Sequence, residues 1–135
     1  MSRRLLAVML LAGAFAGPAS AEDDPIDTKL DACLGDEMST QGMVECYGAA
    51  YEAWDAALND AYGALMKTLT AEEAGKLRDA QRAWIAFRDA ESNFLASLMT
   101  PDRGTIMRIT TNAMMTDLVK QRTQALRSLA EPWGE

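Results

Sequence analysis

Apolar residues recur every three or four positions through three long segments of this chain, and that periodicity constrains its fold most strongly. Such spacing places the apolar side chains on one face of an α-helix, and no segment alternates with the period of two typical of a β-strand. The segments run from about residue 40 to 68, from 71 to 98 and from 105 to 129. Their apolar positions are Val44, Tyr47, Tyr51, Trp54, Leu58, Tyr62, Leu65 and Leu69; Leu77, Ala80, Trp84, Phe87, Phe94, Leu95 and Leu98; and Met107, Met114, Met115, Leu118, Leu126 and Leu129.

Boundary signals indicate that the helices are joined by short connections. Thr70, with Glu73 three residues later, forms a capping box, and the stretch 100–104 has the composition of a surface loop. Asp24, followed by a proline, begins a short N-terminal helix that Gly35 is expected to end. Helices with short connections pack as antiparallel neighbours. The sequence therefore predicts an all-α fold, a small antiparallel bundle of three long helices with a short N-terminal helix.

The first 21 residues have the order of a secretory signal peptide, with a basic start, an apolar run and small residues before a cleavage site at Ala21. The apolar run is shorter than the roughly 20 residues that a membrane anchor needs. The first cysteine, Cys33, lies well beyond the cleavage site, which argues against lipid attachment there. We therefore expect residues 1–21 to be removed, with no membrane anchor afterwards, and residues 22–135 to form a single periplasmic domain.

The charge of the chain favours basic partners. Its formal net charge of −7 becomes −9 once the leader, with two basic residues and no acidic one, is removed. Nucleic acids and anionic lipid surfaces are poor partners for such a protein, because phosphate binding needs a positive surface. A basic protein would be attracted at a rate that salt reduces. The alternative is that the acidic surface serves only solubility.

Two cysteines, Cys33 and Cys46, are present, and there is no histidine. In an oxidising compartment such a pair favours a disulfide, which would close a loop of about 14 residues and add roughly 3 kcal/mol of stability. The lack of histidine removes the commonest metal ligand and the usual base for a nucleophilic serine or cysteine. No metal or cofactor is therefore expected.

Several charged residues fall on the apolar faces of the predicted helices. Arg88 lies about 40° from Trp84 around the helix axis, and Glu91 about 20° on its other side. Asp55 borders the apolar face of the preceding helix, and Arg122 lies on that of the last helix. Gln81 lies near the edge of its apolar face, and Asn59 lies further round its helix than Asp55. Two acids and two arginines are thus expected to converge between the helices, either as a polar network that fixes helix register or as a recognition surface open at one end.

The same carboxylates do not favour an enzyme. A glycosidase needs two acids across a cleft that holds a sugar, and a bundle of this size offers little cleft for Asp55 and Glu91 to flank. Neighbouring arginines would also lower the carboxyl pKa values, which is the wrong direction for a general acid. We therefore expect no catalysis. A carboxylate hydrolase is the remaining enzymatic alternative, and it would depend on Glu91.

Three groups of residues carry a family resemblance over about residues 33–129. The first is Cys46, Ala49, Ala50, Tyr51, Trp54, Asp55, Leu58, Asn59, Tyr62 and Leu65; the second is Leu77, Ala80, Gln81, Arg82, Ala83, Trp84, Ile85, Phe87, Arg88, Asp89, Ala90 and Glu91; the third is Gly104, Thr105, Ile106, Leu118, Arg122 and Leu126. Together they resemble the lysozyme inhibitor LprI-like domain, long known as a domain of unknown function. The resemblance implies a small, helical, exported bacterial domain, some relatives of which are associated with lysozyme inhibition.

The chain departs from that family pattern in two respects. Many relatives carry a second cysteine pair, at positions that hold Ser92 and Met114 here. The inhibiting type protein is a lipoprotein, whereas this leader lacks a cysteine at its cleavage site. The predicted function is a non-catalytic protein-binding domain that inhibits a basic lysozyme by covering its substrate cleft. The alternative is a structural or stress-related envelope module with a different, endogenous partner. The sequence leaves the oligomeric state open.

Overall fold

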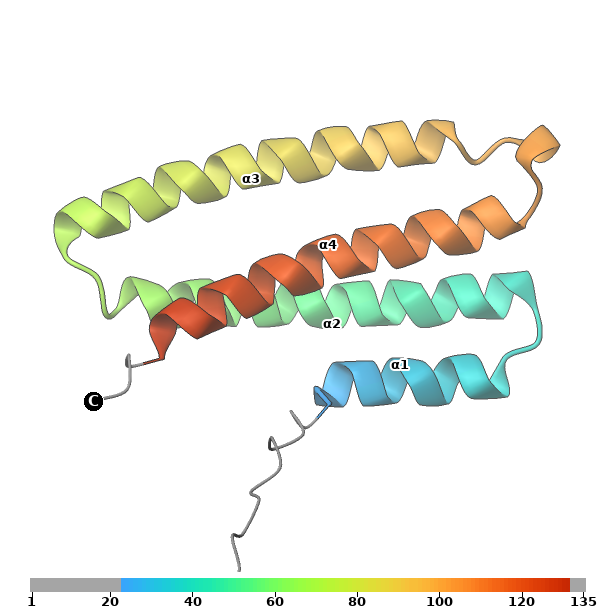
Figure 1. The fold of residues 1–135 in the computed structure, drawn as a ribbon, viewed down its shortest axis with the longest axis horizontal. Coiled ribbons are helices and arrows are strands. Elements are labelled where there is room, and N and C mark those ends of the chain that lie inside the picture. Colours follow the sequence, from blue (N-terminus) through green and yellow to red (C-terminus); the bar gives the residue numbers. More distant parts are fainter. Residues whose placement is uncertain (1–22, 132–135) are drawn as a thin grey trace, which may run out of the picture.

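A computed structural model describes residues 23–131, and the chain in this range is helical. Its elements, in chain order, are α1 (Pro25–Asp36), α2 (Thr40–Met66), α3 (Ala71–Ser97), the 3₁₀ turn η1 (Pro101–Arg103) and α4 (Ile106–Ala130) (Figure 1). The all-α prediction is confirmed, with one short and three long helices and no strand among the described residues. The predicted leader, residues 1–21, lies outside this range. None of the helices between residues 23 and 131 has both the length and the apolar content needed to cross a bilayer.

Side-chain caps fix where the first three helices begin. The Asp24 carboxylate accepts a hydrogen bond from the Ile26 N–H at 2.9 Å, and the Ser39 hydroxyl accepts one from the Gly42 N–H at 3.0 Å. Thr70 and Glu73 form the expected reciprocal capping box at the start of α3. These bonds satisfy amide groups that have no partner inside the helix. The expectation that Gly35 ends α1 is wrong, because the helix continues to Asp36 and extended backbone begins at the following residue.

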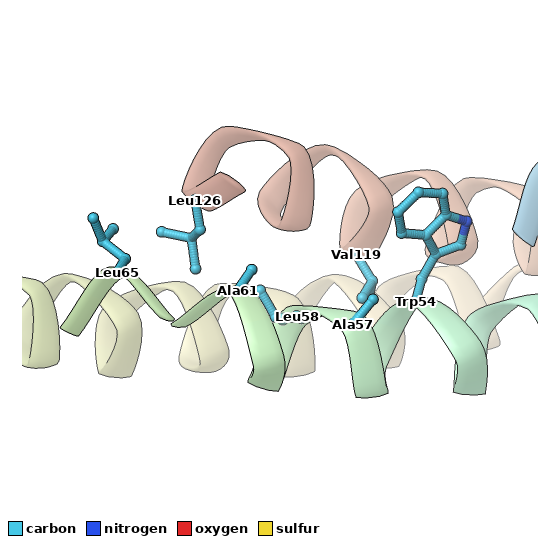
Figure 2. Close-up of a cluster of buried hydrophobic side chains, with 7 residues drawn as sticks. All are labelled: Trp54, Ala57, Leu58, Ala61, Leu65, Val119 and Leu126. Atoms are coloured by element: carbon cyan, nitrogen blue, oxygen red, sulfur yellow. The ribbon is translucent and has the colours of Figure 1, made fainter. Parts of the chain in front are cut away.

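The core of the protein lies between α2 and α4. Its buried members are Trp54, Ala57, Leu58, Ala61, Leu65, Val119 and Leu126 (Figure 2). The Trp54 side chain extends from α2 toward α4 and is fully buried, as is that of Val119. Alanines at two of the seven positions leave room for the backbones of α2 and α4 to approach each other. The helix pair that carries the core is therefore α2 and α4.

Threonines supply much of the buried face of α4. Thr111, Thr116 and Thr123 are all buried, and each hydroxyl donates a hydrogen bond to a carbonyl one turn earlier in α4. The Thr116 and Thr123 hydroxyls also lie 3.2 and 3.3 Å from carbonyl oxygens of α2, those of Tyr47 and Trp54. A hydroxyl satisfied in this way can be buried at little cost, and its methyl group packs as an aliphatic one would.

The expected methionine and leucine face of α4 is therefore partly wrong. Met114 and Leu129, which were expected to be buried, are 47% and 50% exposed. Because the threonine side chains occupy the contact with α2, these larger residues turn toward solvent.

Helix α3 is the least buried of the long helices. Only Ala74 and Leu95 are buried on it, while Leu77 and Trp84 pack against the edge of the core. Phe87 and Phe94 were expected in the core but are 51% and 56% exposed. The physical reason is that α2 and α4 already cover each other's apolar faces, so α3 runs along α4 with much slighter packing (Figure 1).

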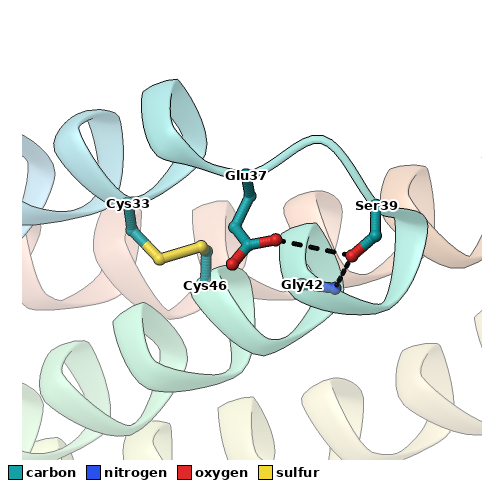
Figure 3. Close-up of a disulfide and its surroundings, with 5 residues drawn as sticks. All are labelled: Cys33, Glu37, Ser39, Gly42 and Cys46. Atoms are coloured by element: carbon teal, nitrogen blue, oxygen red, sulfur yellow. Dashed lines mark hydrogen bonds between the residues drawn. A yellow bond between two sulfur atoms is a disulfide. The ribbon is translucent and has the colours of Figure 1, made fainter.

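Helix α1 is held to α2 by the predicted disulfide. Cys33 and Cys46 are bonded, with their Cα atoms 5.8 Å apart (Figure 3). No residue of α1 is buried, so the helix contributes little core of its own. At the adjacent turn the Glu37 carboxylate lies over Gly42, so a larger side chain there would require this flexible carboxylate to move. The covalent bond is therefore the main attachment at the C-terminal end of α1.

Candidate functional site

On α3, the ring of Trp84 lies close to two arginines. The guanidinium carbons of Arg88 and Arg122 lie 5.6 and 6.0 Å from the centre of the Trp84 ring, within the range of cation–π attraction. The Arg122 Nε donates a hydrogen bond of 2.9 Å to the Gln81 Oε1. Gln81, Trp84 and Arg88 come from α3 and Arg122 from α4, so this group joins the two helices.

Arg88 also links α3 to α2. Its Nε and Nη2 atoms donate to the Asp89 carboxylate at 3.0 and 2.8 Å, and its Nη1 lies 3.6 Å from the Asp55 carboxylate. Burial lowers the pKa of Arg88, but the bonds to Asp89 and the nearby Tyr51 and Asp55 raise that pKa by more, so the net change is upward. The Asp55–Arg88 pair is partly open to water and is worth little by itself.

The other members of the predicted polar set are not joined to it by ion pairs. Within the described part of the chain, Arg122 has no carboxylate at ion-pair distance, and burial lowers its pKa. Because arginine stays protonated in proteins, the charge is retained, and it is stabilised by the hydrogen bond to Gln81 and by the Trp84 ring. Glu91 forms no ion pair with any residue between 23 and 131, and Asn59 is exposed. The structure thus brings together Asp55, Gln81, Trp84, Arg88, Asp89 and Arg122. Glu91, which is half-buried, and the exposed Asn59 lie outside this group.

A second charged cluster, which sequence reasoning missed, covers the core tryptophan. Lys120 Nζ lies 2.7 Å from the Asp27 carboxylate, and Arg127 Nη1 lies 2.8 Å from that of Asp24. Both cations also lie over the Trp54 ring, at 5.8 and 5.4 Å from its centre. The bases are seven residues apart on α4 and the acids three apart at the start of α1, so each pair shares a helix face. That spacing was the available signal, but no pattern within either segment indicated that they meet.

This second cluster shifts the pKa values of its members. Burial raises the pKa of Asp24. Hydrogen bonds from the Ile26 amide and from Arg127 lower this pKa by a larger amount, so the net change is downward. The bond to Asp27 raises the pKa of Lys120. Both ionised forms are therefore favoured in the folded protein, and the cluster fastens the N-terminal end of α1 to α4.

Changing Asp24 to asparagine tests this electrostatic attachment. Asparagine keeps the helix cap and loses only the charge, so the free energy of unfolding at pH 7 should fall by about 0.5 kcal/mol. Because the folded pKa of Asp24 lies below its ordinary value of 3.8, its contribution is present above that value and is lost as the pH falls through the folded pKa. In urea titrations the difference from the wild type should therefore be the same at pH 7 and pH 5 and smaller at pH 3. Asp31→Asn, an exposed charge on the same helix, is the control; an equal loss there would contradict the prediction.

The described residues offer no constellation suited to metal chemistry. No group of three or more cysteine, aspartate and glutamate side chains between residues 23 and 131 is arranged to hold a metal ion. The ion pairs that join different helices are arginine or lysine paired with aspartate. What the arrangement can do chemically is bind: α3 presents aromatic and charged side chains to solvent beside α4.

Comparisons with known proteins place the chain in a family. The family model described as "Lysozyme inhibitor LprI" matches residues 31–126. A crystal structure of an uncharacterized protein from Burkholderia thailandensis matches with a TM-score of 0.75 and 31% sequence identity, over 81% of this chain and 54% of that one. This chain thus spans about half the length of that protein. The comparison with curated proteins gives no match. Since the family match covers most of the four helices, the resemblance drawn from the sequence motifs is confirmed, and the chain belongs to the LprI lysozyme inhibitor family.

Proposed function

We propose that this protein is an exported, non-catalytic domain that binds a basic lysozyme-type muramidase and inhibits it by covering the substrate cleft. The observation that carries the proposal is membership of the LprI family over residues 31–126. The helical scaffold supports it, because a rigid pair of packed helices with a less buried third one can present side chains to a partner without a catalytic cleft.

The charge of the protein gives the proposal a mechanism. A formal net charge of −7, or −9 without the two basic residues of the leader, attracts a basic enzyme and speeds its encounter with the inhibitor. Exposed acids are spread over the molecule, and they include Asp60 on α2, Asp79 on α3 and Asp102 at η1. General attraction of this kind brings the partners together, and a more specific contact must then fix their orientation.

A lysozyme activity assay tests the proposal directly. Purified residues 22–135, with the disulfide formed, are mixed with a basic lysozyme, and the hydrolysis of peptidoglycan is followed at low and at moderate salt. We expect inhibition that saturates at one inhibitor per enzyme and weakens as salt rises, because exposed charges are screened. An unrelated acidic protein of equal net charge is the control for non-specific association. Absence of inhibition at micromolar concentration would reject the proposal, and co-purification with another envelope protein would then favour the structural alternative.

A further inference from the structure

A shallow groove runs between α3 and α4, beside the segment of α3 from Phe87 to Leu95. It encloses 260 Å³ and is lined by Phe87, Glu91, Leu95, Met114, Asp117, Leu118 and Gln121. Leu95 is buried, whereas Phe87 and Met114 are 51% and 47% exposed on opposite helices. The groove therefore has apolar walls that remain accessible to solvent.

Both charged residues of the groove are acids. Glu91 lies on α3 and Asp117 on α4, and neither forms an ion pair with another residue of the described chain. The bases closest in sequence are engaged elsewhere: Arg88 with Asp89, Lys120 with Asp27, and Arg122 with Gln81. Asp117 is near enough to Lys120 to favour its protonated form, but the ammonium group itself is bound to Asp27. Two carboxylates in an apolar setting thus have no cation of their own.

From this arrangement we propose that the α3–α4 groove is the partner-binding site and receives a lysine or arginine side chain, flanked by an apolar residue, from a basic protein. The cation pairs with Glu91 and Asp117, while its aliphatic stem and the neighbouring apolar residue pack on Phe87 and Met114. Such a pair gains strength because the apolar walls exclude part of the water. The proposal rests on the proposed function for the identity of the partner as a basic lysozyme.

Charge decides between this occupant and others that an apolar groove could accept. A second copy of the chain would bring the same two carboxylates and a net charge of −7, or −9 without the leader, to the contact, which opposes association. An anionic lipid or a nucleic acid would be repelled for the same reason. A cationic, partly apolar segment of a protein fits the groove, because its apolar groups can pack on the walls while its cation pairs with the two acids.

A pair of charge-matched variants tests the groove. In Glu91→Gln/Asp117→Asn the groove loses both charges with little change of shape. In the control, Glu52→Gln/Asp36→Asn, two exposed acids outside the groove are neutralised, so both proteins lose the same net charge. We expect the groove variant to bind lysozyme at least about tenfold more weakly at moderate salt, and the control to change less than about twofold. Equal losses in the two variants would overturn the proposal.

Methionine methyl resonances give a readout that does not depend on lysozyme. Met114 lies in the groove, and Met38, which is 92% exposed at the turn between α1 and α2, serves as the reference. The probe is a short peptide of alternating arginine and leucine, with a glutamate-for-arginine version as control. We expect the arginine peptide to shift the Met114 methyl and not that of Met38, and expect this shift to disappear in the groove variant.

The two experiments separate failure of the groove from failure of the proposed function. If lysozyme is not inhibited but the peptide still shifts the Met114 methyl through Glu91 and Asp117, the lysozyme proposal fails and the groove stands. If lysozyme is inhibited equally by the wild type and the groove variant, and the Met114 methyl does not respond, the groove proposal is overturned and the proposed function stands. If neither probe reaches Met114, the groove is not a binding site.

Discussion

Replacing Trp54 with alanine is expected to lower the free energy of unfolding by about 3–5 kcal/mol, the usual loss for a large aromatic residue in a core. Trp54 is completely buried between α2 and α4, and Lys120 and Arg127 lie over its ring. The substitution would therefore remove the centre of the core and the surface on which the second charged cluster rests. Chemical denaturation followed by helical circular dichroism measures the loss.

Two further variants show whether the loss belongs to this position. Trp54→Phe should cost much less, because the indole Nε1 is buried without a hydrogen-bond partner in the described chain, and its removal relieves an unsatisfied donor. Trp84→Ala, on the half-buried motif of α3, should cost less than half as much as Trp54→Ala. A larger loss at Trp84 than at Trp54 would mean that the core lies under α3, contrary to the structure.

Removing the disulfide should be the next largest change, with a loss of about 3 kcal/mol for a cross-link between residues 13 positions apart. We expect Cys33→Ser/Cys46→Ser to unfold at lower denaturant concentration and to show faster amide exchange in α1. The reason is that α1 has no buried residue, so without the bond it is held mainly by its contacts with α2 and by the ion pairs of Asp24 and Asp27.

The chain provides its own control for this experiment. The protein has two cysteines in all, so a reducing agent should destabilise the wild type and leave the double serine variant unchanged. Equal stability of the oxidised wild type and the variant would show that the packing of α1, rather than the bond, holds it in place.

The helices and most of their ends were predictable because the signals that fix them are local. The spacing of Tyr51, Trp54, Leu58 and Leu65 defines a helix face wherever that face is packed, and the Thr70 capping box acts within a single turn. The disulfide followed from the number of cysteines and the expected compartment. None of these inferences needed knowledge of which helices touch.

The pairing of the helices was harder to predict, because periodicity marks a face but does not identify its partner. Trp84, Phe87 and Phe94 form as regular a pattern as the core positions of α2, yet Phe87 and Phe94 remain half exposed. The buried face of α4 was missed because threonines such as Thr116 and Thr123 count as polar in a sequence, although their hydroxyls are satisfied within the helix.

The candidate site was predictable only in part, for the same reason. Arg88 and Asp55 were expected to meet, and they lie 3.6 Å apart. The contact of Asp24 and Asp27 with α4 depends on residues about 90 to 100 positions apart, and no local pattern reports a contact of that range. The groove was not predictable either, because helix periodicity directs Glu91 toward an interior network and marks nothing at Asp117.

The sparse packing of α3 has a consequence for local opening of the molecule. Local opening free energies follow the density of buried contacts, so α3 separates from its neighbours at a smaller cost than α2 and α4 separate from each other. A ligand bound between α3 and α4 would therefore keep closed the part of the protein that opens most readily. The conformational entropy lost in this way would reduce the affinity of the ligand.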